Sequence, residues 1–384
     1  MSNINQTEGV QIDLTSESPY HRQELITWWD QKALLSSKVL VVGAGALGNE
    51  IVKNLALVGV GNITIVDMDI IEHTNLARCV FFRKEDELKL KAEVLAREAS
   101  RMNVDVKANY FTSPIQELGD AFLLQFDLIL AGLDNREARV WLGAAAKRTG
   151  KVWIDAAIEG LMGKVQTFVP DGPCYACTMG DKDWEALTKR LSCKLLGVEE
   201  MEGGHAPTNA TTSSIIAGIQ TQEAIKYLVG KKDFYALENK VWRMLGEQMA
   251  TFTSVVEISD DCPFHFDFIE TQGTAVLPAV MNEIWATFNE TEDAILSFYD
   301  DFITIDECPS CPTPSKFGYK DLMKKQGTCQ NCDLTLTVNL ASRISLRDEL
   351  ATKIINPDHW PMQTLVEFKS DNGTRRYRLD RSNQ

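Results

Sequence analysis

The fold is decided by the stretch Lys38-Val39-Leu40-Val41-Val42-Gly43-Ala44-Gly45-Ala46-Leu47-Gly48. Its apolar residues before the first glycine predict a buried strand, and the apolar spacing of residues 48–58 predicts a helix after the loop. Gly43, Gly45 and Gly48 have the spacing that lets a backbone turn tightly and approach a phosphate, with the helix amino terminus directed at the negative charge. A nucleotide-binding loop is therefore expected.

The alternation of strand and helix continues to about residue 266. Strands are predicted at residues 62–66, 126–131, 152–154 and 164–169, and helices at 91–102 and 215–229. This order predicts an α/β fold whose first domain, residues 1–266, contains a Rossmann-like, mostly parallel sheet. Asp67 follows the second strand, where an acidic side chain accepts hydrogen bonds from ribose hydroxyls. Taken alone, the three glycines and Asp67 also fit an NAD-dependent oxidoreductase.

Composition limits the classes of function. The chain has 384 residues, of which 44% are hydrophobic, so two domains with their own cores are expected. The formal net charge of -15 argues against a nucleic-acid partner, because binding to a phosphate backbone needs clustered Lys and Arg. Residues 1–14 lack the apolar segment of a signal peptide, and no run of about 18 apolar residues occurs, so we expect a soluble, cytoplasmic protein without a membrane partner.

A series of polar residues follows the glycine loop. It comprises Asp67 and Asp69, then Asn75 and Arg78, then Lys91 at the start of a predicted helix. Two further segments belong with it, Gly132-Leu133-Asp134-Asn135 after an apolar strand and Tyr20-His21-Arg22-Gln23 near the amino terminus. Over residues 19 to about 266 these motifs resemble the ThiF/MoeB/HesA superfamily, which includes the activating enzymes of ubiquitin and ubiquitin-like proteins. Ala46 departs from the pattern, because the family usually has another glycine there.

The resemblance implies an adenylation domain that binds ATP and Mg²⁺. Asp67, in an Asp-x-Asp segment with Asp69, would hold the ribose. Asp134, followed by Asn135, would hold Mg²⁺ just past the carboxyl end of a strand. Judged singly, Asp134 is equally compatible with an Asx-turn ahead of the next helix.

The resemblance also assigns the cations. In-line attack of a carboxylate on the α-phosphorus of ATP builds negative charge on the phosphate oxygens, so positive side chains must converge there. Asn75, Arg78 and Lys91 would orient and neutralise the phosphates within one chain, although Arg78 and Lys91 taken singly are equally compatible with ordinary surface residues. Arg22 would reach the phosphates of the neighbouring subunit, which implies a homodimer.

Cysteine pairs predict zinc. Cys174 and Cys177 follow a strand and a Pro-Asp-Gly-Pro turn, which is typical of a knuckle that presents two thiolates to one ion. In the resembled family a second pair follows a helix and a strand, and that position here holds Cys262 and His265. The resemblance therefore implies a structural Cys₃His zinc site, where the family more commonly has four cysteines.

A second zinc site is predicted by spacing alone. Cys308 and Cys311 are followed, after seventeen residues, by Cys329 and Cys332, a spacing expected of a zinc ribbon. An alternative pairs Cys308 and Cys311 with the knuckle at residues 174–177 and leaves Cys329 and Cys332 free. Reduced, buried cysteines at both places are the remaining alternative.

Cys193 is the candidate acceptor. It lies among Lys189, Arg190 and Lys194, whose charges favour a thiolate. In the resembled family its span, about residues 180–206, is a crossover loop, and in the ubiquitin-type branch that loop carries the cysteine that receives the activated protein as a thioester. A solvent-facing bystander and a sulfur-transfer cysteine are the alternatives. Cys79 lies in an apolar setting and is assigned no role.

The expected function is ATP-dependent activation of a ubiquitin-like or sulfur-carrier protein at its C-terminal glycine. Residues 267–384 are expected to form a small α+β module with the zinc ribbon, which by analogy recruits a downstream conjugating enzyme. Three rivals stay open: the oxidoreductase, ATP-dependent dehydration of a modified tRNA base, which the acidic balance opposes, and a non-catalytic scaffold.

Overall fold

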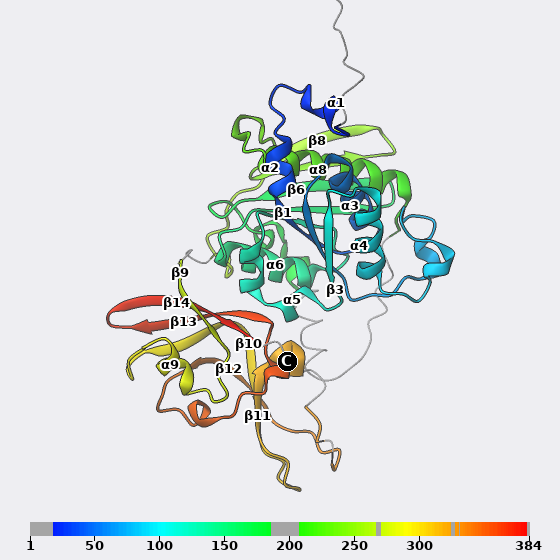
Figure 1. Cartoon of the computed structure of the whole chain (residues 1–384). Coiled ribbons are helices and arrows are strands. Elements are labelled where there is room, and N and C mark those ends of the chain that lie inside the picture. Colours follow the sequence, from blue (N-terminus) through cyan, green and yellow to red (C-terminus); the bar gives the residue numbers. More distant parts are fainter. Residues whose placement is uncertain (1–17, 186–206, 266–269, 324–326, 330, 382–384) are drawn as a thin grey trace, which may run out of the picture.

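The computed structural model describes residues 18–185, 207–265, 270–323, 327–329 and 331–381. Two sheets organise the chain (Figure 1). The first has eight strands in the order β3-β2-β1-β4-β5-β6-β7-β8. Its strands are β1 (Lys38–Val42), β2 (Asn62–Val66), β3 (Lys107–Phe111), β4 (Leu128–Ala131), β5 (Trp153–Glu159), β6 (Met162–Phe168), β7 (Lys240–Leu245) and β8 (Ala250–Val255).

The predicted Rossmann-like, mostly parallel sheet is confirmed. The strands β3, β2, β1, β4 and β5 run parallel, and β6, β7 and β8 continue the sheet in antiparallel pairs. The chain order reverses between β1 and β4, and in open α/β sheets ligands bind at the carboxyl ends of the strands at such a point. The helices that flank the sheet are α3 (Ala46–Val58), α4 (Lys91–Met102), α5 (Ile115–Leu118), α6 (Arg136–Arg148) and α8 (Ala210–Leu228).

The central strand β1 is buried on both faces, which explains its continuous apolar run. Val39 and Val41 point into a core shared with α3, α4 and α8, while Leu40 and Val42 point into a second core shared with α5 and α6. Two short helices, α1 (His21–Glu24) and α2 (Gln31–Ser36), precede this strand. Among the described residues, no helix is both long enough and apolar enough to cross a membrane.

Steric crowding explains two of the three loop glycines. Gly43 has φ +101°, and a Cβ atom there would lie 2.6 Å from the carbonyl oxygen of Gly132, which follows β4. A Cβ at Gly48 would lie 1.9 Å from the carbonyl oxygen of Gly43. Gly45 differs, because a Cβ there would meet nothing within 4 Å. Neighbouring backbone atoms therefore leave no room for a side chain at Gly43 or Gly48, whereas the space next to Gly45 is open.

Replacing these glycines should separate packing from function. Gly48→Ala is expected to destabilise the protein by about 1–3 kcal/mol, because the new methyl group collides with backbone that must move. Gly45→Ala is the matched control and should change stability by no more than about 0.5 kcal/mol, since φ is -74° and its Cβ direction is open. Urea denaturation measures both, and equal losses of stability would contradict this account of the loop.

The second sheet belongs to the C-terminal part of the chain. It has six strands in the order β11-β10-β13-β14-β9, with β12 paired to β10. The turn residues Asp371-Asn372-Gly373 predict a hairpin, and β13 and β14 form it. The elements are β9 (Thr271–Val276), α9 (Glu283–Thr287), β10 (Ile295–Ile305), β11 (Lys316–Tyr319), α10 (Lys320–Met323), β12 (Val338–Ile344), β13 (Gln363–Ser370) and β14 (Gly373–Asp380).

One predicted helix is much shorter than expected. The sequence predicts a helical stretch around residues 279–288, whereas α9 begins at Glu283 and ends at Thr287. Val280 instead forms a β-bridge with Ile354, so the start of the segment is held extended. The predicted domain boundary near residue 266 falls among residues 266–269, outside the described residues, and stays a prediction.

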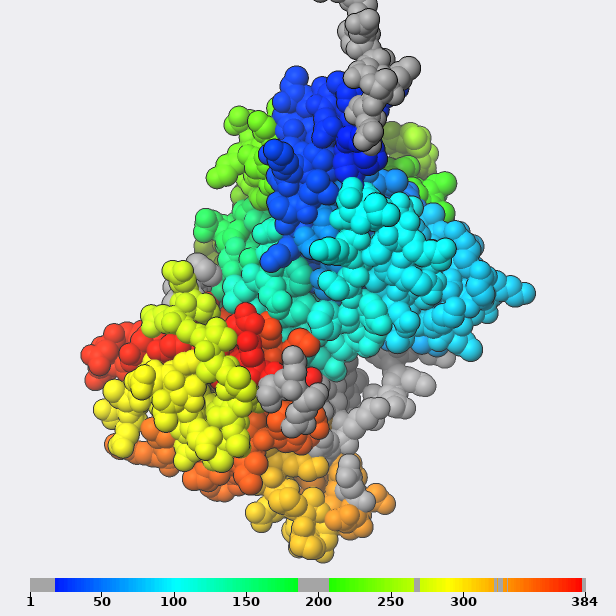
Figure 2. Space-filling view, viewed as in Figure 1, coloured from blue at the N-terminus to red at the C-terminus, as the bar shows by residue number. Residues whose placement is uncertain are grey.

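The C-terminal lobe packs directly against the α5 and α6 side of the first sheet (Figure 2). Buried polar groups make the contact: Trp141 Nε1 donates to Asp300 Oδ1 of the C-terminal lobe at 2.9 Å, and Asp120 Oδ2 accepts from Arg148 Nε of its own lobe at 3.1 Å. The other oxygen of Asp120 accepts the Leu365 N–H at 2.9 Å. Helix α6 thus extends from the nucleotide-binding edge of the sheet to the second lobe, and the lobe helps to fix its position.

Candidate functional site

Asp67 braces the glycine loop. It directly follows β2, its Oδ2 accepts the N–H of Ala44 at 2.7 Å, and its Oδ1 accepts the N–H of Asp69 at 2.8 Å. Burial raises the pKa of Asp67, and these two hydrogen bonds oppose that effect. Each carboxylate oxygen keeps a second lone pair. The predicted ribose contact is therefore compatible with the structure, but the visible role of Asp67 is to hold the loop.

Lys91 and Asp69 form an ion pair next to Asp67. Lys91 Nζ lies 2.9 Å from Asp69 Oδ2, and the Lys91 side chain is only 12% exposed. Burial acts to lower the pKa of Lys91, but the hydrogen bond to Asp69 and the charges of Asp67 and Asp69 outweigh it, so the pKa is raised. Lys91 stays a cation at neutral pH, at the edge of the sheet where the glycine loop lies.

Asn75 and Arg78, the two predicted site residues between Asp69 and Lys91 in the sequence, have different roles in the structure. Arg78 is half-buried and donates to the hydroxyl of Thr208, which precedes α8. Asn75 is buried, and its side-chain oxygen accepts the N–H of Glu72, so it stabilises the local turn. Arg78 therefore links this edge to the start of α8, whereas the visible hydrogen bond of Asn75 is structural.

Asp134 and Asn135, which follow β4, have different roles in the structure. Asn135 caps α6, because its side chain accepts the N–H of Ala138 at 2.7 Å. Asp134 is exposed, and in the described part of the chain no hydrogen bond or ion pair occupies its carboxylate. The Asx-type cap is thus made by Asn135, which leaves Asp134 free to bind a cation.

Arg139 and Asp155 support this segment, and the sequence analysis did not identify either of them. Arg139 is buried, its Nε donates to Asp155 Oδ1 at 2.9 Å, and its Nη2 donates to the carbonyl oxygens of Leu133 and Ala156. The guanidinium therefore holds the backbone residue just before Asp134. A charged residue one turn after the helix cap was the available signal, but its partner on β5 could not be read from the sequence.

Arg22 lies at the opposite edge of the sheet. Its neighbour Tyr20 accepts a hydrogen bond from Asn103, which follows the end of α4, and donates to Asp105, which precedes β3. Both contacts lie at the amino edge of the parallel strands, whereas the glycine loop lies at the carboxyl edge, about 20 Å away along α3. Within one chain, the structure does not bring Arg22 to the nucleotide loop.

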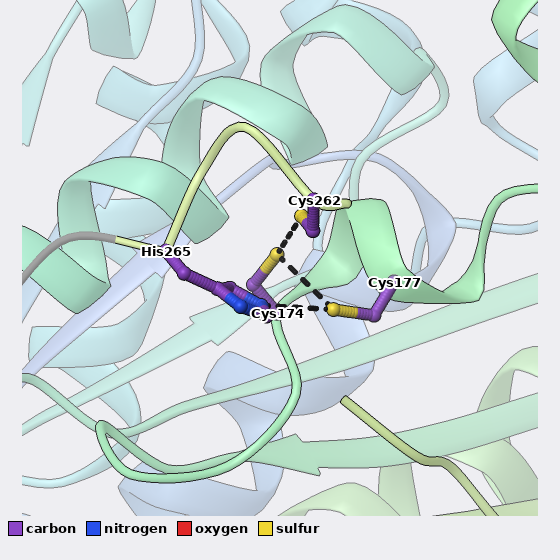
Figure 3. Close-up of side chains that lie close together, drawn as sticks. All are labelled: Cys174, Cys177, Cys262 and His265. Carbon is purple, nitrogen blue, oxygen red and sulfur yellow. Dashed lines mark hydrogen bonds between the residues drawn. The ribbon is translucent and has the colours of Figure 1, made fainter. Parts of the chain in front are cut away.

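The first predicted zinc cluster is assembled (Figure 3). The sulfur of Cys174 lies 3.8 Å from that of Cys177 and 3.5 Å from that of Cys262, and Cys177 Sγ lies 3.0 Å from His265 Nε2. Tetrahedral zinc with Zn–S bonds of about 2.3 Å separates its sulfur ligands by about 3.8 Å. Burial raises the pKa of the Cys174 thiol and lowers that of His265, so a cation is what would stabilise the thiolate, and the imidazole is neutral as a ligand must be.

The second predicted cluster is also assembled. Cys308 Sγ lies 3.5 Å from Cys332 Sγ, and Cys311 Sγ lies 3.3 Å from Cys329 Sγ. The four ligand atoms of each cluster lie within 4.8 Å of one another. The alternative pairing of residues 174 and 177 with 308 and 311 is not the arrangement that the structure brings together. Both donor sets fit zinc.

Metal analysis should therefore find two zinc ions per purified chain, one for each cluster. The double variant Cys308→Ser/Cys311→Ser is expected to keep one ion and Cys174→Ser/Cys177→Ser the other, because the ligand sets share no residue. Inductively coupled plasma mass spectrometry measures this stoichiometry. Cys193→Ser is the control and should retain both ions. A single ion in the unsubstituted chain would contradict two separate sites.

Two cysteines, Cys79 and Cys193, lie outside these two clusters in the sequence. Cys193 lies in residues 186–206, outside the described residues, as does most of the predicted crossover loop. Cys79 is buried, and burial raises the pKa of its thiol to about 11, as expected for an inert core residue.

The fold and the site together define a class of protein. It is a protein with a Rossmann-like sheet that carries an unpaired carboxylate, a paired lysine and a cluster of cysteine and histidine side chains. Residues 20–263 match the model of the ThiF family, so the chain belongs to that family and the resemblance seen in the motifs is confirmed.

Similar proteins include activating enzymes. The NEDD8-activating enzyme E1 catalytic subunit of Schizosaccharomyces pombe is 35% identical over 167 residues, which cover 42% of this chain and 36% of that protein. The SAMP-activating enzyme E1 of Haloferax volcanii is 31% identical over 240 residues, which cover 61% of this chain and 82% of that protein. The chain thus spans little more than a third of the length of the first relative.

The fold also has solved counterparts. The crystal structure of Escherichia coli MccB with ATP gives a TM-score of 0.54 at 22% identity and covers 66% of this chain and 75% of that one. At this identity the similarity concerns the fold.

Proposed function

We propose that this protein uses ATP and Mg²⁺ to adenylate the C-terminal glycine of a ubiquitin-like or sulfur-carrier protein. The observation that carries the proposal is the convergence of the open glycine loop, the Lys91–Asp69 pair and the free Asp134 carboxylate at the ends of β1, β2 and β4. Neighbouring strands lie about 4.8 Å apart, so these groups lie within reach of one nucleoside triphosphate.

The residues support this chemistry step by step. The backbone above Gly45 is open to a phosphate, and Lys91 and Arg78 supply positive charge beside it. Asp134 would hold Mg²⁺. A carboxylate oxygen of the carrier attacks the α-phosphorus, the bond to the bridging oxygen breaks, and pyrophosphate leaves with the electron pair.

Arg22 would act on the partner's nucleotide in a homodimer. Next to it, Leu25, Ile26 and Leu57 are 59%, 41% and 53% exposed, and Gln23 on α1 donates to the carbonyl of Leu57 at the end of α3. An exposed apolar patch beside a cation that cannot reach its own site supports a subunit interface there.

The fate of the adenylated carrier is the finer part of the proposal. Cys193 would receive the acyl group as a thioester, after which a conjugating enzyme would bind; delivery of sulfur to a carrier protein is the alternative. The similar proteins are named for activating NEDD8 and SAMP, which supports a small carrier protein as the substrate class.

ATP:pyrophosphate exchange tests the proposal. Exchange is expected only with a carrier whose terminal glycine carboxylate is free, and not when that carboxylate is amidated. If the protein catalyses no exchange with any tested carrier but transfers hydride to NAD, the proposed adenylation is wrong and the protein is an oxidoreductase. Cys193→Ala should abolish a thiol-sensitive adduct while leaving exchange intact. An adduct that persists in Cys193→Ala removes the acceptor assignment alone.

A further inference from the structure

Asn49 is a buried polar residue near the start of α3, directly after the glycine loop in the sequence. It is fully buried, and its side chain makes three hydrogen bonds. Asparagine is a poor helix former, and a polar side chain is seldom fully buried without partners. The partners of Asn49 therefore indicate what the residue does at this position.

The amide nitrogen of Asn49 binds the carbonyl groups of the glycine loop. Its Nδ2 donates to the carbonyl oxygen of Ala44 at 2.9 Å and to that of Gly45 at 3.1 Å. The backbone N–H of Asn49 also donates to the Gly45 oxygen, at 2.9 Å. Both carbonyl groups are therefore directed into the protein, toward the start of α3.

These hydrogen bonds also fix the direction of two N–H groups. In a trans peptide the C=O and the N–H point in opposite directions, so the N–H groups of Gly45 and Ala46 face away from α3. Within the part of the chain that the structure describes, no hydrogen bond occupies either N–H group. Because the space next to Gly45 is open, two donors face the position where a phosphate would lie.

The amide oxygen of Asn49 binds the segment that carries Arg78. Its Oδ1 accepts the N–H of Phe81 at 3.1 Å, and the N–H of Arg78 donates to the carbonyl oxygen of Asn75 at 3.1 Å. One side chain thus holds both the loop that offers N–H donors and the segment that offers a cation. An amide suits this position because it combines two donors with an acceptor.

Building on the proposed function, we propose that Asn49 is a positioning residue for the phosphates of ATP. It keeps the loop carbonyl groups turned away from the phosphates and the N–H groups turned toward them, and it keeps the Arg78 segment beside the loop. A carbonyl turned outward would instead place a negative partial charge next to the phosphates. Since Asn49 is buried, it acts through the loop and not on ATP itself.

Binding of ATP to the full chain tests this assignment without a carrier or turnover. Asn49→Ala removes all three side-chain hydrogen bonds and is expected to weaken ATP binding by about 10-fold, measured by isothermal titration calorimetry with Mg²⁺. The matched control is Asn62→Ala, which removes an amide that donates to Ser37 at the amino edge of the sheet and should leave ATP binding unchanged. Normal ATP binding by Asn49→Ala would overturn the inference.

A pH profile of Asn49→Asp separates positioning from a general loss of stability. The new carboxyl has the shape of the amide, and burial raises its pKa toward neutral pH. When protonated, it can donate to a loop carbonyl and accept from Phe81, whereas the carboxylate can only accept and adds negative charge near the phosphates. Positioning therefore predicts ATP binding that weakens as the pH rises.

The profile is measured relative to the unsubstituted chain at the same pH, which cancels the protonation of ATP itself. Asn49→Asp should bind ATP within about 3-fold of the unsubstituted chain at about pH 6 and at least about 30-fold more weakly at about pH 8.5. Returning one sample from the higher to the lower pH should restore binding, because the variant stays folded. The same relative loss at both pH values would show that the donated hydrogen bonds do not order the loop, and would overturn the inference.

The same titrations distinguish the two proposals. If the unsubstituted chain binds ATP and Asn49→Ala binds it equally well, this inference is wrong and the proposed function stands. If the unsubstituted chain binds no ATP in the presence of Mg²⁺, the proposed function is wrong and this inference is wrong with it.

Discussion

Asp134→Asn is expected to lower the rate of ATP:pyrophosphate exchange by about 100- to 1000-fold while the protein stays folded. The carboxylate is accessible to solvent, and no described residue occupies it, so its charge contributes little to folding. Asn135 makes the cap of α6, so the helix should start unchanged in the variant. Circular dichroism and thermal unfolding check the fold, and exchange is measured with a carrier that the unsubstituted enzyme accepts.

Magnesium dependence makes this test specific. If Asp134 binds Mg²⁺, the variant should need a higher magnesium concentration for its remaining activity, whereas a merely structural defect would leave that dependence unchanged. Asp371→Asn, which removes the same charge from the exposed turn between β13 and β14, is the control and should exchange at the normal rate. Full exchange activity in Asp134→Asn would remove the residue from the site.

Local patterns explain what the sequence could predict. The run Lys38–Val42 and the glycines after it are contiguous, so strand, loop and helix follow from neighbouring residues alone. The two clusters of candidate zinc ligands were also predictable, because ligand types and short spacings are local, although joining Cys174 to Cys262 required knowledge of a family pattern. These features need no knowledge of how distant segments pack.

Long-range pairings explain what was missed. Strand β10 contains Asp300 and Asp301 in its middle, which interrupts the apolar pattern and hides an eleven-residue strand. The structure accounts for Asp300, since Trp141 and Arg148 from the other lobe bind its carboxylate. The pairing of Lys164 on β6 with Arg243 on β7 likewise depends on the register of these two strands, which the sequence does not reveal.

Mixing two inactive variants is expected to restore activity if Arg22 acts on the partner's nucleotide. Arg22→Ala and Lys91→Ala should each lower exchange by at least about 100-fold, because each removes a cation from the developing charge. In a mixed dimer, one site combines an intact Lys91 with an intact Arg22 from the other chain, and the second site lacks both. A purified mixed dimer should therefore recover about half of the normal exchange rate per dimer.

The control for complementation uses two residues of the same site. A mixed dimer of Lys91→Ala and Asp134→Asn should stay inactive, since each site then lacks one residue that only its own chain can supply. Differently tagged, co-expressed chains give both mixed dimers in pure form. Because Tyr20 anchors Arg22 at the amino edge of the strands, recovery by a chain acting alone would require Tyr20 to leave its contacts with Asn103 and Asp105. A monomeric protein with full exchange activity, or a mixed Arg22→Ala/Lys91→Ala dimer that stays inactive, would show that Arg22 has no role across the interface.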